Sequence, residues 1–372
     1  MAHDVIAARW ARAQSLMVKQ GFDALLITEK YNFWYFTGNL TRELEKKMRP
    51  MIVLLPAGGD PVVIVYRQAE KSIRKGAPVN DFLTYEDVPF PIELVAEAVS
   101  MRGLTKARIG AEFGQYERFG MSIGQFETTK EQLPGVTFSD ASAIFEELRI
   151  VKMPDEVDLI RKACALSLRA WDKAVPRFEF GMVNNDLKRV LAAALIEEGS
   201  DFDIAGHVTM GNGIHGNEPY RKGQTVWCDF GGTWKGYQAD LARRAIFGEP
   251  DEIQAEYHRQ ISEILHEEIA AIRPGIRASD VATVASNAMV KAGYKPLSSK
   301  KRVGHGVGLC AAEAPSLSLA DDTILMPGMV LTPEPRFDLP TGERMHIEEM
   351  VVVTETGCEV LSHGADRLAV VA

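Results

Sequence analysis

Two aspartates flank a glycine-rich segment in the second half of the chain. The segment "DFGGTWKGYQAD" begins at Asp229 and ends at Asp240, between two β-rich runs. Gly231, Gly232 and Gly236 give the backbone the freedom that a tight turn needs, so the segment predicts a β-hairpin. A hairpin would bring the two carboxylates together, where they repel unless a cation or a proton lies between them. On this segment alone, two solvated aspartates near a turn are the alternative.

Three further groups capable of acid–base or metal chemistry lie downstream. His305 stands between two glycines in "RVGHGVGLCAAEAP", Glu334 follows an apolar run in "GMVLTPEPRF", and Glu348 precedes another in "MHIEEMVVVTETG". Each is weak evidence alone, because a single His or Glu is usually solvated or an ordinary packed residue. Together with the aspartates they form five such groups in apolar, strand-like sequence. Buried carboxylates are costly unless they are paired or bind metal.

Composition and charge exclude several classes of protein. The 372 residues include 42 basic and 51 acidic side chains, and the resulting net charge of −9 disfavours nucleic acid or an anionic membrane as a partner. No apolar run approaches the roughly 18 residues that span a bilayer, and the first residues lack the apolar core of a secretory signal. The four cysteines form no C-x-x-C pair, which argues against disulfides or a structural zinc site. We therefore expect a cytoplasmic protein.

Other motifs compete with the acidic groups and are weaker. "GMSIG" fits the serine-hydrolase pattern G-x-S-x-G, but "QYERF" before it is a poor strand. "HEEIA" at His266 fails the zinc motif H-E-x-x-H and predicts an exposed helix, and "GHGVG" lacks the Lys-Ser/Thr of a phosphate loop. Cys228 adjoins Asp229, but strand alternation turns it to the opposite face, where we expect it to pack.

The elements that must position these groups predict an α/β (α+β) chain of two domains. In the first part, "FDALLIT", "MIVLLP", "PVVIV" and "ARIGAE" predict strands, while "PIELVAEAVSMRG" and residues 122–133 predict helices. A long amphipathic helix then begins near Pro154, with acidic residues in its first turn. We place the domains at residues 1–150 and 151–372.

The second domain contains an internal repeat. "GMVNNDLKRVLAAALIEEG" (181–199) aligns without gaps on "GIRASDVATVASNAMVKAG" (275–293). Each copy predicts helix, glycine turn, helix, and then a β-rich stretch, although chance similarity of two amphipathic helices is the alternative. The repeat favours a duplicated α/β unit whose two sheets join into one curved sheet backed by helices. A site between the halves would draw its residues from both.

The order of the motifs D-x₁₀-D, G-H-G-x-G-L, T-x-E-P and I-E-[DE] resembles the pita-bread metallopeptidases. This family includes methionine aminopeptidase, aminopeptidase P, prolidase and the metal-free creatinase, and the resemblance is strong over residues 152–356. The segment "YFTG" (35–38) also resembles the N-terminal domain of the prolidase and creatinase branch. The resemblance thus implies a creatinase-like N-terminal domain and a C-terminal pita-bread catalytic domain.

The resemblance also implies a dinuclear metal centre. Asp229 would bind one ion, His305 and Glu334 the other, and Asp240 and Glu348 would bridge them. Four carboxylates and one imidazole suit two ions such as Mn²⁺, which we favour, or Co²⁺ or Zn²⁺. A hydroxide bridging the ions would cleave an amide bond, with Glu334 as the proton acceptor. Metal-free chemistry of the creatinase type is disfavoured because that enzyme does not keep the full ligand set.

Substrate residues follow the resemblance less closely. His215 matches the family's active-site histidine, and His207 and His346 are further candidates for binding the substrate. Many proline peptidases carry a histidine where this chain has Ala312, and many prolidases carry an arginine in place of His346. We therefore expect Xaa-Pro dipeptides to be poor substrates.

The functional alternatives follow from these departures. A Xaa-Pro dipeptidase or aminopeptidase leads, and a non-peptidase hydrolase or lyase of a small polar C–N substrate follows. A non-catalytic protein that binds metal or a partner is third, but no metal ligand is lost. Relatives of the prolidase type are homodimers in which a loop reaches the partner's pocket. Here that loop is "NLTRELEKKMRP", whose Arg42 and Arg49 are candidate carboxylate binders.

Overall fold

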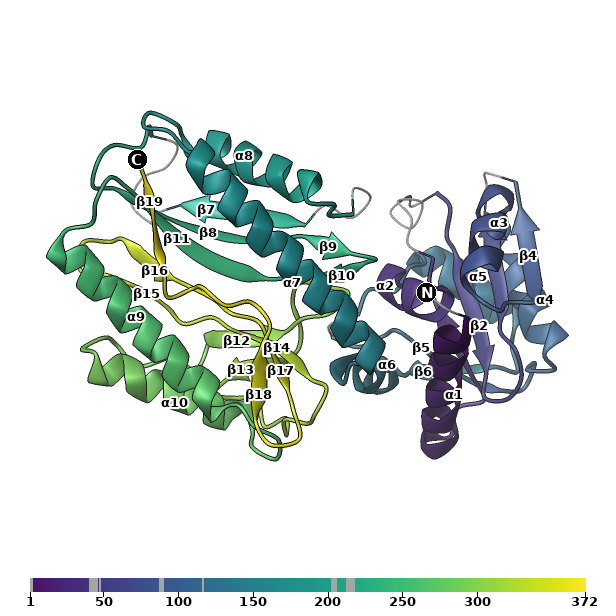
Figure 1. The fold of residues 1–372 in the computed structure, drawn as a ribbon. Helices are drawn as coiled ribbons and strands as arrows, with labels where there is room; N and C mark the ends of the chain where they lie inside the picture. Colours follow the sequence, from purple (N-terminus) through teal and green to yellow (C-terminus); the bar gives the residue numbers. More distant parts are fainter. Residues whose placement is uncertain are drawn as a thin grey trace. The chain divides into compact units, whose positions relative to one another are not determined.

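The chain forms two compact units, Met1–Arg149 and Ile150–Ala372, which are described separately (Figure 1). The computed structural model describes residues 3–39, 46, 48–86, 90–115, 117–201, 206–211 and 218–372. His215 and Arg42 therefore lie outside the described residues. In the described part of the chain, no helix combines the length and the apolar composition that a membrane span requires.

The first unit is built on a mixed sheet of six strands in the order β4-β3-β2-β1-β5-β6. β1 to β3 are buried along their whole length, which explains their continuous apolar sequence. The predicted strands and helices of this unit are confirmed with small shifts at their ends. The strands are β1 (Ala24–Ile27), β2 (Ile52–Pro56), β3 (Val62–Tyr66), β4 (Asp81–Tyr85), β5 (Arg108–Ala111) and β6 (Thr137–Asp140).

Helices cover this sheet, and one of them uses the serine of "GMSIG". Ser122 is the N-cap of α5: its hydroxyl accepts the amide hydrogen of Gln125 at 3.2 Å, in a capping box. Ser122 thus caps a helix instead of following a strand, which excludes the serine-hydrolase alternative. The helices are α1 (His3–Gln20), α2 (Lys30–Thr37), α3 (Arg67–Gly76), α4 (Glu93–Met101), α5 (Ile123–Gln132) and α6 (Ser142–Ile150).

The second unit contains two helix pairs that follow the predicted repeat. α7 (Pro154–Ala174) and α8 (Asn184–Glu197) form the first pair, and α9 (Glu252–Ala271) and α10 (Ala278–Lys291) form the second. The glycines at both ends of each repeat copy have left-handed backbone angles with matching values: φ is 87° at Gly181 and Gly275, 91° at Gly199 and 88° at Gly293. Glycine adopts this conformation without strain, so the two copies share their turns as well as their sequence.

The two larger sheets of the second unit follow its two halves, except that the C-terminal strand joins the sheet of the first half. The four-stranded sheet has the order β19-β11-β8-β7, and the five-stranded sheet has the order β13-β12-β14-β17-β18. A backbone bridge joins the two: the Glu348 amide donates to the Ala242 carbonyl at 3.1 Å. Helices back both sheets, as the repeat predicts (Figure 1). The strands are β7 (His207–Gly211), β8 (Thr225–Gly231), β11 (Leu241–Phe247), β12 (Arg302–Gly306), β13 (Glu313–Ser318), β14 (Val330–Pro333), β17 (Val351–Val353), β18 (Cys358–Val360) and β19 (Leu368–Val371).

Candidate metal centre

The two aspartates lie on the predicted hairpin. β8 and β11 pair antiparallel with Asp229 opposite Ala242, and Asp240 lies one residue before β11. The hairpin turns at Lys235 and Gly236, whose φ angles of 48° and 83° are those of a tight turn. Cys228, the neighbour of Asp229, is fully buried, in agreement with a packing role.

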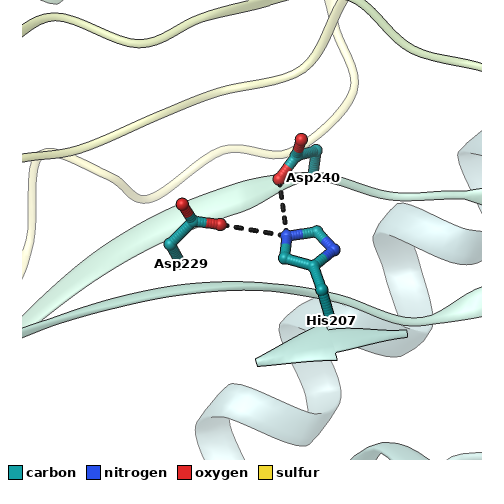
Figure 2. A group of neighbouring side chains, drawn as sticks. All are labelled: His207, Asp229 and Asp240. Carbon is teal, nitrogen blue, oxygen red and sulfur yellow. Dashed lines mark hydrogen bonds and ion pairs between the residues drawn. The ribbon is translucent and has the colours of Figure 1, made fainter. Parts of the chain in front are cut away.

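His207 reaches both aspartates from β7. Its Nε2 atom lies 2.9 Å from Asp229 Oδ1 and 2.7 Å from Asp240 Oδ1. Figure 2 shows the imidazole facing both carboxylates. Burial opposes a charge on this imidazole, but the hydrogen bonds to the two carboxylates outweigh burial and raise the pKa of His207 to about 10. The His207 ring therefore lies between the two aspartates, at the place where a cation would neutralise both.

The other three acidic and imidazole groups come from the second half of the repeat. His305 lies on β12, Glu334 directly follows β14, and Glu348 stands at the bridge between the sheets. His305 Nε2 lies 3.7 Å from Asp240 Oδ2 and 3.6 Å from Glu334 Oε1. The Thr332 hydroxyl donates to Glu348 Oε1. The bridge therefore brings side chains from both copies of the repeat to one place.

Two of these carboxylates are only partly satisfied by hydrogen bonds. Glu334 Oε1 and Glu348 Oε2 are buried and have no hydrogen-bond partner among the described residues. Burial, together with the charges of Asp240 and Asp229, raises the pKa of Glu334 to about 7. Burial and the neighbouring carboxylates raise the pKa of Glu348 well above its ordinary range. Buried acids arranged in this way are stable as anions only if cations lie among them.

The geometry suits divalent cations. Three groups of potential ligand atoms each fall within 4.8 Å: His207, Asp229 and Asp240; Asp229, His346 and Glu348; and Asp240, His305 and Glu348. Carboxylate oxygens with a few imidazole nitrogens are the donors that Mn²⁺- and Zn²⁺-type ions take in proteins. The orphaned oxygens and the donor set both fit bound metal.

His346 borders the centre on β16 (Arg344–His346), which pairs with β15 (Arg336–Asp338). Its Nε2 atom lies 3.9 Å from Asp229 Oδ2 and 4.0 Å from Glu334 Oε2. Burial lowers the pKa of His346 to about 4, so this imidazole is neutral at physiological pH. The indole of Trp227 tilts against it with ring centroids 5.8 Å apart. Of the predicted substrate residues, His207 and His346 therefore lie at the candidate metal centre.

Arg49 belongs to the first unit, where its guanidinium lies 5.0 Å from the centroid of the Tyr66 ring. Its predicted role in a pocket shared between subunits stays a prediction. The same holds for Arg42 and His215, which the described ranges do not include.

Sequence inspection missed three residues beside the centre. Arg302 and Arg336 flank Glu334, and Arg336 was detectable because it follows Glu334 by two positions. Glu268 on α9 is fully buried, and neither of its oxygens has a partner among the described residues. Burial, aided by the charge of Glu334, raises the pKa of Glu268 well above its ordinary value. The burial of Glu268 could have been predicted from helical periodicity, because Glu268 lies on the same apolar face of the helix as Ile261 and Leu265.

Comparison with known proteins defines the class of protein. Residues 158–355 match the metallopeptidase family M24, and residues 9–151 match the creatinase/prolidase N-terminal domain. The chain belongs to metallopeptidase family M24 and is a metal-dependent hydrolase.

Similar proteins span the whole chain. A protein of Mycobacterium tuberculosis described as "probable dipeptidase PepE" is 30% identical over 384 aligned positions, covering 99% of this chain and 97% of that protein. The crystal structure of dipeptidase PepE from Mycobacterium ulcerans superposes with a TM-score of 0.81 and 28% identity, covering 100% of this chain and 99% of the other. A dipeptidase structure from Pyrococcus horikoshii OT3 gives a TM-score of 0.83 at 27% identity, with 97% and 99% coverage.

Proposed function

We propose that this protein is a dinuclear-metal hydrolase resembling the Xaa-Pro dipeptidases and aminopeptidases, which cleaves the amide bond of a short peptide. The observation that carries the proposal is the group of buried carboxylates with orphaned oxygens at the junction of the two sheets. The similar proteins described as dipeptidases support a small peptide as substrate. A non-peptidase hydrolase or lyase is not favoured, because the matching family is described as a metallopeptidase family and the similar proteins as dipeptidases.

Five residues would hold the two ions. We assign Asp229 to one ion, His305 and Glu334 to the other, and Asp240 and Glu348 to positions between them. The bridging assignment is supported because Asp240 and Glu348 share one ligand group with His305, while each also shares a group with Asp229. Mn²⁺ is our proposed metal, since carboxylate oxygens outnumber imidazoles in this set.

The residues around the centre prepare it for catalysis. When bound, the ions would lower the pKa of a water molecule and polarise the amide carbonyl. Glu334, beside the ions, would accept the proton of this water and could return it to the leaving amine. His305 Nδ1 lies 3.0 Å from the Gly306 carbonyl, so it carries the hydrogen and leaves Nε2 free as a ligand. The Thr332 hydroxyl orients Glu348 in the same way.

The proposal also includes the oligomeric state, three further active-site residues and the cellular location of the enzyme. A homodimer with Arg42 and Arg49 near the substrate, and His215 as a catalytic residue, follow from the family resemblance. We also propose a cytoplasmic location, which is supported by four free cysteines.

Steady-state kinetics on a panel of Xaa-Pro and other dipeptides, with Mn²⁺, Co²⁺ or Zn²⁺ added to chelator-treated protein, tests this function. We expect metal-dependent release of the C-terminal amino acid. Because Ala312 lacks an imidazole, we expect kcat/KM for Xaa-Pro dipeptides below about 10⁴ M⁻¹s⁻¹, the lower end of the usual enzyme range. Full turnover in protein shown to be free of metal would contradict the dinuclear mechanism.

A further inference from the structure

The two sheets of the second unit meet along a short seam, with Asp240 and Ala242 on one side and Glu348 and Met350 on the other. Ala242 and Glu348 form an isolated antiparallel bridge, in which the Glu348 amide donates to the Ala242 carbonyl at 3.1 Å. Antiparallel pairing continued by two residues along each segment places Asp240 opposite Met350. Both residues that we assign to positions between the ions, Asp240 and Glu348, therefore lie on this seam.

The Asp240 amide points across the seam, away from its own hairpin. Inside the hairpin, the Ala239 amide donates to the Gly232 carbonyl at 2.9 Å. Successive amides of an extended chain point in opposite directions, so the amide of Asp240 faces the second half of the repeat. There it donates to the sulfur atom of Met350 at 3.2 Å. A side-chain sulfur thus takes the place that a regular ladder gives to the carbonyl of Met350.

The main chain of Met350 pairs with another segment, so its thioether is the group that reaches Asp240. The Met350 carbonyl accepts from the Leu361 amide at 2.7 Å, and the Met350 amide donates to the Ser362 hydroxyl at 2.8 Å. A second sulfur group holds the thioether, because Cys164 Sγ, on α7, lies 3.3 Å from Met350 Sδ. Burial raises the pKa of the Cys164 thiol, so the thiol keeps its proton and is the donor.

These contacts are closed to water. Met350 and Cys164 are fully buried, and Asp240 is 6% exposed. A thioether is a weak acceptor, but a buried amide that loses its acceptor is costly. The Met350 sulfur therefore fixes the main chain of Asp240, and with it the position of the Asp240 carboxylate relative to Glu348.

We propose that Met350 is a positioning residue of the metal centre, whose sulfur atom holds Asp240 in place so that the carboxylates of Asp240 and Glu348 reach the same two ions. The inference rests on the dinuclear centre of the proposed function and deepens it. The two carboxylates come from different halves of the repeat, so contacts across the seam decide whether they meet. Partners that orient a metal ligand typically contribute about 10- to 100-fold to metal affinity, so the loss of this contact should appear as weaker metal binding.

The test replaces Met350 with leucine, which has nearly the same volume but no hydrogen-bond acceptor. Calorimetric titration of Mn²⁺ into chelator-treated protein measures the affinity of both ions without any substrate. We expect Met350→Leu to weaken the binding of the second ion by roughly 10- to 100-fold. The kcat/KM for a dipeptide should fall accordingly at limiting Mn²⁺ and recover as the Mn²⁺ concentration is raised, because all five proposed ligands are retained.

The matched control is Met329→Leu. Met329 is equally buried and its sulfur accepts the Met326 amide at 3.4 Å, but it belongs to an apolar cluster with residues of α10. We expect both variants to lower the Tm, since each loses a hydrogen bond to sulfur, whereas Met329→Leu should leave both Mn²⁺ affinities unchanged. Cys164→Ala removes the donor to the Met350 sulfur and should weaken the second ion by less than Met350→Leu does.

Two outcomes would overturn this inference alone. In the first, Met350→Leu and Met329→Leu both lower the Tm but keep the Mn²⁺ affinities of the unaltered chain, which would make Met350 a packing residue. In the second, the kcat/KM of Met350→Leu stays low at saturating Mn²⁺, so the defect does not act through metal binding.

The same titration separates the inference from the proposed function. If the unaltered chain binds two ions but cleaves no dipeptide, the proposed peptidase function fails, while weaker binding of the second ion by Met350→Leu still supports the role of Met350. If the unaltered chain binds fewer than two ions, the dinuclear centre and the role of Met350 are refuted together.

Discussion

Two buried glutamates, one in each unit, show what distinguishes a structural acid from a functional one. Glu112 in the first unit and Glu348 in the second are both 1% exposed. Glu112 accepts hydrogen bonds from the Thr28 amide at 2.8 Å, the Thr28 hydroxyl at 2.7 Å, the Glu29 amide at 3.1 Å and the Asn32 side chain at 3.1 Å. Glu348 accepts one from Thr332, and its Oε2 atom has none among the described residues.

The difference lies in what each carboxyl group requires. Donors of the chain itself satisfy Glu112, which ties β1 and the start of α2 to the end of β5. Glu348 lies among Asp240, Glu334 and Asp229, whose charges add to burial in raising its pKa. A satisfied buried acid holds the fold together, whereas an unsatisfied cluster of acids indicates a bound cation.

The largest expected effect is on catalysis. Glu348→Ala removes a proposed bridging ligand, and we expect kcat/KM to fall by roughly 10³-fold or more, because metal charge stabilisation is worth several kcal/mol. Metal analysis should show fewer than two divalent ions per chain. Glu112→Ala is the control, because Glu112 is as buried as Glu348. The Glu112→Ala protein that remains folded should bind the same number of metal ions and keep its kcat/KM. Equal loss of metal in both variants would erase the distinction between the two acids.

The second effect is on stability. Glu112→Ala leaves several buried donors unpaired, and we expect it to lower the free energy of unfolding by about 2–4 kcal/mol. Glu348→Gln in chelator-treated protein should be neutral or stabilising, since it removes an acid from a repelling cluster. Urea unfolding monitored by circular dichroism measures both. A destabilised Glu348→Gln variant without metal would contradict our interpretation of the orphaned oxygens.

The third effect concerns pH. Burial raises the pKa of Glu334 from 4.5 to about 7, so its contribution to stability is fully present below pH 4.5 and is lost as the pH rises through 7. Burial also raises the pKa of Glu112 to about 8, although its hydrogen bonds act to lower this pKa. The contribution of Glu112 to stability is therefore also lost as the pH rises. We expect the Tm of chelator-treated protein to fall between pH 5 and 8.

Mn²⁺ should remove only the part of this decline that arises in the metal centre, because Glu112 lies in the other unit. Differential scanning fluorimetry of the metal-free and metal-loaded forms across this range measures both parts. A decline that metal leaves unaltered would assign the whole pH dependence to groups outside the centre.

The smallest expected effect concerns Glu268. Its folded pKa is raised, so the same sign applies and its contribution to stability is lost as the pH rises. Glu268→Gln should therefore stabilise chelator-treated protein by roughly 1 kcal/mol at neutral pH. The advantage should shrink toward pH 4. Glu267→Gln, at the exposed neighbouring position, is the matched control and should change the unfolding free energy little.

Local patterns were sufficient for most of the fold. Apolar runs such as "MIVLLP" predicted buried strands, glycines predicted the turn between Asp229 and Asp240, and the spacing of two similar segments predicted the paired helices. These features depend on the periodicity and the backbone freedom of residues that are close together in the sequence, so they can be predicted from the sequence alone. The five acidic and imidazole groups were recognisable for the same reason, as polar residues in apolar surroundings.

Contacts between distant segments were decided only by the tertiary structure. The orientation of His207 onto both aspartates depends on the register of β7 against β8, and the approach of Arg302 and Arg336 to Glu334 depends on strands that lie 34 positions apart. Glu267 and Glu268 look alike in sequence, yet the packing of α9 exposes one and buries the other. The sequence by itself determined which residues could bind metal and which elements would carry them. The pairing of strands and the packing of helices decided which charges meet, because burial and electrostatic interaction depend on distances through space.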